Sequence, residues 1–459
     1  MQSINIIEKN IAVIGAGLTG LTTSFYLNKN KADFLVIEKQ NKTGGVIQTE
    51  KQNGYLIETG PNTGIIGQPE VAELFEDLGD KCTIEIPGKE ANKRFILKNG
   101  KWELLPSGLW KGITTPLFTS RDKIRILGEP FRSRGKNPDE SLSQLVLRRM
   151  GKSFLDYAVD PFILGVYAGN PARLITRHAL PKLYNLEQTY GSFIGGAIKK
   201  GFKKKTPQEM KATKKVFSVK GGLSQLTNAL YKEAGTENFI LGATNLQIQY
   251  ISGKYISTFK NSEGNEITVK SNKLITTTGA YVLNDFMTFL EKENLVPISC
   301  LPYANVVEIV LGFDNWDGME PEGFGGLIPF IEKRNVLGVL FMSSLFMQRT
   351  PNNGTSFTLF MGGIRKPELF EKKESELKAI VEKEFMQLMK PSKFNPSLFN
   401  LYWHKNAIPQ YGIESEARFK QVEKLEKEYP GLIIGGNLKD GIGMSDRIKQ
   451  GKSLAIRAL

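Results

Sequence analysis

Three glycines near the start of the chain, Gly15, Gly17 and Gly20, have the G-x-G-x-x-G spacing. The uncharged run 11–14 before them predicts a strand buried on both faces, and residues 18–27 after them have a helical pattern. In such a turn the first glycine permits a tight bend, the second lets the backbone approach a pyrophosphate, and the third lets the helix pack close to the strand. The helix start offers free N–H groups to the phosphates.

A carboxylate follows where recognition of a ribose needs one. The uncharged run 34–37 predicts a second buried strand that leads into Glu38, 23 positions after Gly15. A carboxylate at this place accepts hydrogen bonds from a ribose diol. Glycine-rich turns are common, so a purely structural strand–turn–helix is the alternative. Strand, helix and acid in the required order make dinucleotide binding our working hypothesis.

Further glycine-rich segments suggest a cofactor longer than a nicotinamide dinucleotide. Gly44 and Gly45 follow Glu38 closely, and the strand pattern 55–58 runs into a turn at 59–63. A flavin ring lies deeper than the ribose and needs such a second backbone approach, although glycine pairs also occur in ordinary turns. About 420 residues after Gly15, a strand pattern at 432–434 leads into glycines at 435–443 and a helix. A second positive helix end suits the electron-rich side of a reduced flavin.

Composition limits the chemistry that side chains can supply. Cys82 and Cys300 are far apart, which argues against a disulfide framework, a thiol metal site and a dithiol redox pair. His178 and His404 are the only histidines, so we expect no multi-histidine metal site and assign neither residue a role. Electrons must therefore come from a bound cofactor if this is a redox enzyme. A chain of 459 residues is expected to form two or three domains.

The net charge of +14 is unevenly distributed. Residues 106–205 hold 18 Lys and Arg against 7 Asp and Glu. Such a region suits nucleic acid, an anionic membrane surface or an acidic substrate, and a solvated basic face is the plain alternative. Apolar residues beside prolines and glycines at 104–110 and 115–118 would suit a membrane interface, and ordinary loop packing would explain them equally well.

The sequence contains neither a signal-peptide pattern nor an uncharged apolar run of the roughly 18 residues that would span a bilayer. We therefore expect an intracellular protein. The remaining patterns predict a hairpin at 94–105, helices at 71–78, 141–149 and 154–165, and a strand at 216–219. Strands at 306–313, 336–342 and 356–360 should form a second, largely antiparallel sheet.

Additional runs extend over nearly the whole chain, among them Val-Tyr-Ala-Gly-Asn-Pro at 166–171 and Ala-Ile-Pro-Gln-Tyr at 407–411. With the glycine turn, these runs resemble the flavin amine oxidase superfamily, and within it the oxygen-dependent protoporphyrinogen oxidases of haem biosynthesis. The other segments that carry the resemblance are 43–45, 58–62, 186–188, 219–223, 323–329, 343–346 and 403–411.

The resemblance implies a mixed α/β and α+β fold. It consists of a discontinuous Rossmann-type FAD-binding domain, an inserted substrate domain with a mixed, largely antiparallel sheet, and an inserted helical domain that associates with a membrane. On this sequence the FAD-binding domain would comprise 1–90, 206–296 and 411–459. The substrate domain would comprise 91–105 and 297–410, and the helical domain 106–205.

The resemblance also implies the residues of the site. Arg94 would pair with a substrate propionate. The macrocycle would be sandwiched near the flavin by Phe324, Leu327 and Phe360. Gly169 is a further predicted residue of the substrate site. No catalytic side chain is expected, because the flavin would accept the hydride. The predicted FAD contacts are Gly15, Ala16, Gly17, Leu18, Thr19, Gly20, Glu38, Lys39, Gly45, Val46, Gly60, Pro61, Asn62, Thr63, Trp403, Ile442, Gly443 and Met444.

The implied reaction removes six electrons from protoporphyrinogen IX in three flavin turnovers, with oxygen reduced to hydrogen peroxide. A porphyrinogen is a flat, apolar ring that carries anionic propionates, so it needs an apolar slot with a cation at its rim. An arginine provides a fork that matches a carboxylate. The chain departs from the family pattern at Val46, where an arginine is common, at Gly412-Ile413 in place of Gly-His, and at Thr278-Gly279-Ala280.

Several alternatives stay open. The substrate could be coproporphyrinogen III, which carries four propionates. More distant alternatives are an oxidase of small amines and a non-catalytic, GTPase-binding protein of the same fold. We expect an anionic membrane surface as a partner, a peripheral position on the cytoplasmic inner face of the cell membrane, and no nucleic acid. A homodimer and product hand-off to a ferrochelatase would be compatible with the family.

Overall fold

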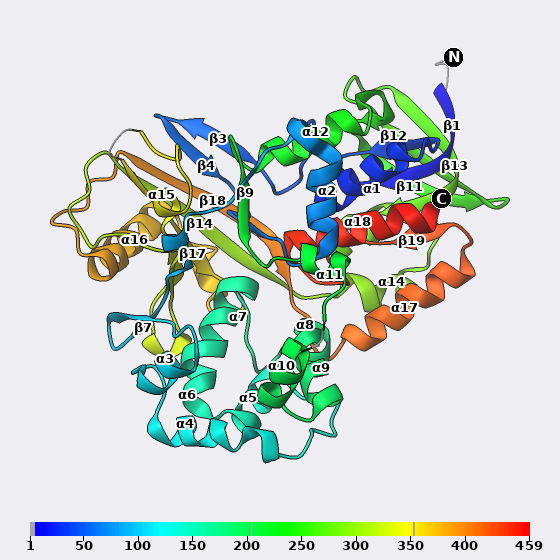
Figure 1. The fold of residues 1–459 in the computed structure, drawn as a ribbon. Coiled ribbons are helices and arrows are strands. Elements are labelled where there is room, and N and C mark those ends of the chain that lie inside the picture. Colours follow the sequence, from blue (N-terminus) through cyan, green and yellow to red (C-terminus); the bar gives the residue numbers. More distant parts are fainter. Residues whose placement is uncertain (1–4, 203, 352–353) are drawn as a thin grey trace.

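The structure is a computed structural model that describes residues 5–202, 204–351 and 354–459. Two seven-stranded sheets lie in the upper part of the view in Figure 1, and a group of helices lies below them. Both marked ends of the chain lie beside the first sheet.

The first sheet combines parallel strands with an antiparallel meander. Its order is β10-β2-β1-β13-β12-β11, and β19 pairs with the last three residues of β13. The end of the chain therefore returns to the strand beside β1. The strands are β1 (Asn5–Ile14), β2 (Phe34–Ile37), β10 (Phe239–Ile240), β11 (Thr244–Ile251), β12 (Lys254–Lys260), β13 (Glu266–Thr276) and β19 (Leu432–Ile434).

Residues 11–14, the last four of β1, are buried on both faces, as their sequence predicts, and the strand extends back to Asn5. Ile11 and Val13 join the cluster formed with α1, α2, α12 and α18, whereas Ala12 and Ile14 join the cluster on the opposite face. Side chains alternate along a strand, so a run without polar residues fits a strand that is covered on both sides. The covering helices are α1 (Leu18–Lys29), α2 (Pro69–Leu78), α12 (Ser224–Glu233) and α18 (Met444–Ala458) on one face, and α13 (Leu283–Phe286), α14 (Lys292–Ser299) and α17 (Ser415–Glu428) on the other.

The second sheet has the order β18-β14-β17-β16-β15-β7-β8 and is antiparallel except for the β15–β7 pair. The predicted hairpin is present as β7 and β8, with its turn at Asn99 and Gly100. Helix α16 (Glu374–Met389) covers one face, where Val307, Ile309 and Leu311 are buried. The strands are β7 (Arg94–Lys98), β8 (Lys101–Leu104), β14 (Tyr303–Phe313), β15 (Gly325–Leu327), β16 (Val336–Leu340), β17 (Thr355–Gly362) and β18 (Leu398–Pro409).

The strand predicted at 336–342 ends two residues early. Strand β16 stops at Leu340, and the short helix α15 (Met342–Leu345) begins at once. Met342 and Leu345 pack in a separate cluster with Phe346, which favours a helical turn over a continued strand. The two-stranded sheet β3 (Thr49–Gln52) and β4 (Tyr55–Glu58) packs through Tyr55 and Ile57 against β14.

Residues 109–202 are largely helical, as predicted. Their core contains an ion cluster in which Arg149 pairs with Glu129 at 2.7 Å and with Glu187 at 2.6 Å, and all three side chains are buried. The helices are α3 (Leu109–Thr114), α4 (Ser120–Leu127), α5 (Leu142–Arg149), α6 (Lys152–Phe154), α7 (Asp160–Tyr167), α8 (Thr176–Ala179), α9 (Pro181–Tyr190) and α10 (Phe193–Phe202).

One of the two candidate membrane loops is part of this core instead. Leu117 and Phe118 are buried beside Ile96 of β7, and the Phe118 ring stacks on Phe154 with centroids 3.8 Å apart. The ordinary packing interpretation of residues 115–118 is therefore correct. Among the residues that the structure describes, none of the helices is long and apolar enough to cross a membrane.

A small three-stranded sheet consists of β5 (Gly64–Ile65), β9 (Val216–Val219) and β6 (Ile84–Glu85). In it, the strands before and after α2 pair with the strand that follows helix α11 (Pro207–Lys211). Close to it, Arg349 donates to Glu58 at 2.8 Å and to Ser218 at 2.6 Å. The mixed α/β class predicted from the sequence is confirmed. The domain boundaries given above stay a prediction.

Candidate cofactor and substrate site

The first glycine turn has the geometry that its spacing predicts. Gly15 has φ +100°, which favours glycine, and its N–H donates to the Ile37 carbonyl at 2.9 Å. A Cβ on Gly20 would lie 1.9 Å from the Gly15 carbonyl oxygen, so only glycine permits this approach of helix to strand. A Cβ on Gly17 would meet no atom of the chain within 4 Å. Gly17 thus faces open space, which fits the close passage of a pyrophosphate.

Glu38 lies directly beside this turn. Its two carboxylate oxygens accept hydrogen bonds from the backbone N–H groups of Ala16 at 2.6 Å and Gln40 at 2.8 Å. A carboxylate has about four lone-pair sites, so lone pairs are left for a ribose diol. The side chains of Leu18 and Thr19 are buried inside the protein, so these two residues could offer a cofactor only their backbone groups. Lys39 is exposed.

The second glycine pair packs against the first turn. The Gly44 N–H donates to the Ala16 carbonyl at 2.8 Å, and a Cβ on Gly45 would lie 3.2 Å from the Gly17 Cα. The next residue, Val46, is 62% exposed although it is apolar. A Cβ on Gly60 would lie 2.2 Å from the Val46 carbonyl oxygen. The structure therefore gathers the predicted contacts of residues 15–20, 45–46 and 60–61 around one place.

The loop near the end of the chain lies against the same region. The Gly435 N–H donates to Thr276 at the end of β13, and the Tyr411 hydroxyl donates to the Asn437 and Gly441 carbonyls at 2.8 and 3.1 Å. Helix α18 starts at Met444 with Gly443 as its N-cap and packs along α1 (Figure 1). Gly443 is exposed, Ile442 is half-buried and Met444 is buried.

Sequence reasoning missed a buried arginine under this loop. Arg447 lies in the first turn of α18 and donates to the Lys439 carbonyl at 2.8 Å and to Gln450 at 2.7 Å. Burial lowers the pKa of its guanidinium. A cation in the first turn of a helix opposes the helix dipole, so neither amphipathic pattern nor capping preference would indicate it.

Leu327, Phe360 and Arg94, three of the predicted substrate residues, share one face of the second sheet. Phe324 directly precedes β15 and packs with Met342, Leu345 and Phe346. Strand register places Leu327 beside Gly338, and Gly338 beside Phe360, so the two larger side chains flank a position without a side chain. Arg94 lies two positions before Ile96, the partner of Leu327, and its guanidinium is 5.1 Å from the centre of the Phe324 ring. Arg94 is exposed. The arrangement is an apolar row with an arginine near one end.

Helix α7 covers part of this row. A Cβ on Gly165 would lie 2.5 Å from a methyl group of Leu327. Phe162 and Val166 are 43% and 40% exposed and are four residues apart, so they lie on the same helix face as each other. Gly169 follows the helix, is buried, and leaves no room for a Cβ because Gln410 lies 2.5 Å away. Phe162 and Val166 are further candidates that the sequence did not indicate.

Trp403, Asn62 and Thr63 are the remaining predicted FAD contacts. Trp403 on the edge strand β18 is 41% exposed and pairs with Val307, whose side chain points to the α16 face. The pairing does not bring Trp403 onto the face of Phe360. Thr63, half-buried, follows Asn62, which is buried and donates to Gly60 at 3.0 Å and to Glu308 at 2.7 Å. The roles of all these residues in binding stay predictions.

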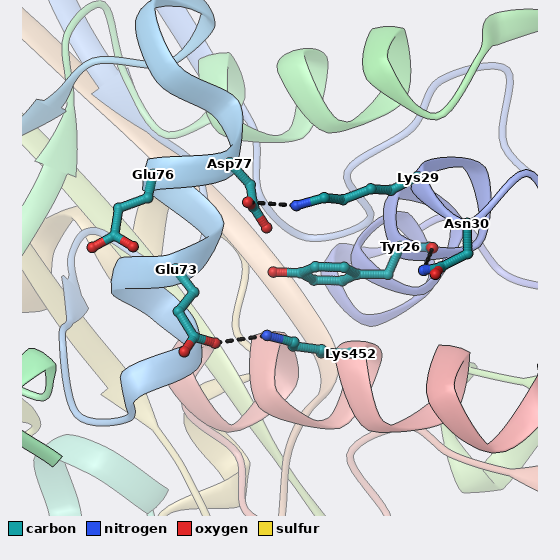
Figure 2. Close-up of a pocket in the computed structure, with 7 residues that line it drawn as sticks. All are labelled: Tyr26, Lys29, Asn30, Glu73, Glu76, Asp77 and Lys452. Atoms are coloured by element: carbon teal, nitrogen blue, oxygen red, sulfur yellow. Dashed lines mark hydrogen bonds and ion pairs between the residues drawn. The ribbon is translucent and has the colours of Figure 1, made fainter. Parts of the chain in front are cut away.

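A polar surface hollow of about 400 Å³ lies elsewhere, between α1, α2 and α18 (Figure 2). The Tyr26 side chain points across it toward α2, between Glu73 and Asp77. Ion pairs join Lys29 to Asp77 at 2.5 Å and Lys452 to Glu73 at 2.6 Å. These charges neutralise each other, and the hollow contains none of the predicted site residues.

Comparisons with known proteins agree with this architecture. Residues 18–453 match the family described as flavin containing amine oxidoreductase. The mitochondrial protoporphyrinogen oxidase of Nicotiana tabacum is 31% identical, with 97% of this chain and 94% of that protein covered. The coproporphyrinogen III oxidase of Bacillus subtilis (strain 168) is 24% identical, with 98% of each covered. A crystal structure from Exiguobacterium sp. 255-15 superposes with a TM-score of 0.80 at 19% identity, covering 100% of this chain and 99% of that one.

The fold and the family match define an FAD-dependent oxidoreductase. The chain belongs to the flavin-containing amine oxidoreductase family. The residues present fit the cofactor, because the space beside Gly17, the carboxylate of Glu38 and the start of α18 offer what a pyrophosphate, a ribose and a flavin require.

Proposed function

We propose that this protein oxidises protoporphyrinogen IX to protoporphyrin IX in haem biosynthesis, with oxygen as the electron acceptor and hydrogen peroxide as the second product. The observation that carries the proposal is the apolar row of Leu327, Gly338 and Phe360 with Arg94 near its end. A flat macrocycle with anionic propionates needs such a surface and such a cation. The identity to the tobacco enzyme over nearly the whole chain supports the same substrate class.

In this proposal the chain supplies binding and orientation. Arg94 holds a propionate through its guanidinium fork, and its stacking on Phe324 orients the fork. Gly338 leaves room for the edge of a ring between Leu327 and Phe360, and α7 packs through Gly165 against Leu327 at one end of the row. Bound FAD supplies the hydride acceptor. The residues that would hold it surround Gly17, Glu38 and the 441–444 loop.

Coproporphyrinogen III is the second candidate substrate, supported by the full-length similarity to the Bacillus subtilis enzyme. It carries four propionates, so it would need more cations than Arg94. The test is to supply purified, flavin-loaded protein with each porphyrinogen and to measure porphyrin fluorescence and peroxide. We expect faster turnover of protoporphyrinogen IX. Exclusive turnover of coproporphyrinogen III would select the second candidate, and peroxide formed only with a panel of small amines would overturn both.

We also propose that the helical region binds an anionic membrane surface, on the cytoplasmic face of the cell membrane. The support is an exposed apolar group on α4 and on the 3-10 turn Glu129–Phe131, next to Arg121, Lys123 and Arg125. Ile124, Leu127 and Phe131 are 69%, 74% and 91% exposed. Apolar side chains flanked by cations suit an interface between headgroups and acyl chains.

Co-sedimentation with vesicles tests this membrane proposal. We expect the protein to sediment with anionic vesicles at low salt and to lose most of this binding when Leu127 and Phe131 are replaced by serine. Binding to anionic vesicles that is unchanged by both replacements, or absent altogether, would overturn it. A homodimer and direct hand-off of the product to a ferrochelatase are further proposals, which cross-linking and sedimentation with a purified ferrochelatase would test.

A further inference from the structure

A fully buried carboxylate lies in the middle of the second sheet. Glu308 is 0% exposed and interrupts the apolar strand β14, where it pairs with Phe360 of β17 on one side and Tyr402 of β18 on the other. An apolar residue would fill this position without the cost of removing a charge from water. The carboxylate therefore needs partners.

Glu308 has one side-chain partner on each side, and the Gly60 backbone N–H also faces its carboxylate. One carboxylate oxygen accepts from the Asn62 amide at 2.7 Å, and the other lies 3.0 Å from Nε2 of His404 on β18. Burial raises the pKa of Glu308, and the hydrogen bonds from His404 and Asn62 oppose that rise. The His404 side chain is 20% exposed, so the pair extends from the buried face to solvent.

Asn62 connects this pair to the predicted cofactor turn, residues 60–62. Its amide also donates to the Gly60 carbonyl at 3.0 Å, and its oxygen accepts from the Thr358 hydroxyl on β17 at 3.0 Å. Every polar group of the Asn62 side chain is thus engaged: the contact with Gly60 lies within the turn, and those with Glu308 and Thr358 hold the turn against the second sheet. Glu308 is the only charged one among these partners.

We propose that Glu308 and His404 are positioning residues, which hold the cofactor turn against the substrate sheet and make the affinity for FAD depend on the protonation of the Glu308 carboxylate. The inference rests on the proposed placement of FAD beside residues 60–62, and it does not depend on which porphyrinogen is oxidised. When Glu308 is ionised, one oxygen accepts from the Asn62 amide and the other accepts from the protonated Nε2 of His404; when it is protonated, one oxygen becomes a donor and both hydrogen bonds lose their charge assistance.

The direction of the pH dependence follows from the groups that face Glu308. Strand β18 contributes His404 and Tyr402, and Tyr402 donates to Glu50 at 3.0 Å. Burial is the main cause that raises the pKa of Tyr402 to about 12, so this phenol stays neutral. The turn and β17 contribute Asn62 and Thr358, which do not titrate. As pH falls, Glu308 gains a proton and loses its charge, so its hydrogen bond from Asn62 weakens and the turn is held less firmly; FAD affinity should therefore fall on the acid side.

The experiment measures the dissociation constant of FAD against pH by flavin fluorescence for the wild type, Glu308→Gln and His404→Gln. The matched control is His178→Gln, because His178 is the other histidine and contacts Phe419 away from the turn. Glu308→Gln should bind FAD about tenfold more weakly at neutral pH, since a charge-assisted hydrogen bond is lost, and its profile should be flat on the acid side. His404→Gln should weaken binding less.

A spectroscopic readout separates positioning from a general loss of structure. With only two histidines, ¹⁵N-histidine spectra of the whole protein give two sets of signals, which His178→Gln assigns. We expect FAD to shift the His404 signals and to leave those of His178 in place. The inference is overturned if FAD leaves the His404 signals unchanged, or if Glu308→Gln or His404→Gln retains the wild-type affinity and pH profile. A wild-type protein that binds no FAD would instead overturn the proposed function.

Discussion

Gly17 and Gly20, the last two glycines of the first turn, allow a direct test of where the cofactor lies. Gly17→Ala adds a methyl group that meets no atom of the chain within 4 Å, and its φ of −73° suits alanine. Any large effect must therefore come from a bound molecule. Gly17 is also the N-cap of α1, where alanine costs about 1 kcal/mol or less of stability. We expect the flavin-free variant to unfold almost like the wild type.

The loss of cofactor affinity should be much larger. The methyl group would displace a phosphate from the backbone N–H groups at the start of α1, and a hydrogen bond to a charged group contributes about 1.5–3 kcal/mol. This range corresponds to a dissociation constant for FAD that is about 10- to 150-fold higher. Gly20→Ala is the contrasting variant, because its methyl group would lie 1.9 Å from the Gly15 carbonyl oxygen. Overpacking of this kind costs about 1–3 kcal/mol even without cofactor.

The assay combines urea unfolding of the flavin-free proteins with fluorescence titration of FAD. Gly17→Ala should change the titration and leave the unfolding midpoint nearly unaltered, whereas Gly20→Ala should lower the midpoint itself. A Gly17→Ala protein that binds FAD with wild-type affinity would refute the reasoning, since the open space beside Gly17 would then not hold the pyrophosphate.

Three further predictions concern single contacts. Glu38→Gln should weaken FAD binding about tenfold in the same titration, because an amide replaces one acceptor oxygen near the ribose with a donor, and unchanged affinity would count against the ribose contact. Arg94→Met should raise the KM for the porphyrinogen about tenfold with little change in kcat, and Arg94→Lys should reverse part of this rise in KM. Equal losses in kcat and kcat/KM would point to a role for Arg94 other than substrate binding. Arg349→Met should destabilise the fold by about 3–5 kcal/mol in urea unfolding, because it leaves the buried Glu58 carboxylate unpaired, and the Arg349→Met, Glu58→Gln double variant should recover part of this cost.

The sequence predicted the features of the site that depend on local backbone geometry. The glycine at position 15 is required by a positive φ, and the glycine at 20 by the contact between a helix and the strand that precedes it. Such constraints act over a few residues, so they leave a readable spacing. The hairpin at Asn99 and Gly100 and the buried strand at 11–14 were predictable for the same reason.

The apolar loops show where local patterns were insufficient. Residues 104–110 and 115–118 look alike in sequence, yet Leu104 is 41% exposed and Leu117 is buried beside Ile96. Burial of a loop depends on which element packs over it, and the hydrophobic periodicity of the loop's own sequence does not indicate that element. The sequence likewise did not indicate that Ile124, Leu127 and Phe131 are exposed, because their pattern is that of a short helix.

By itself the sequence determined the glycine turn, the carboxylate beside it and the class of fold, since each is set by neighbouring residues and alternating burial. Only the tertiary structure decided that Asn62 meets Glu308, 246 positions away, and that His404 completes the contact from another strand. A single glutamate in an apolar strand was the one local sign of this cluster. Its partners depend on the register in which distant strands pair, and register is fixed by the packing of the whole sheet.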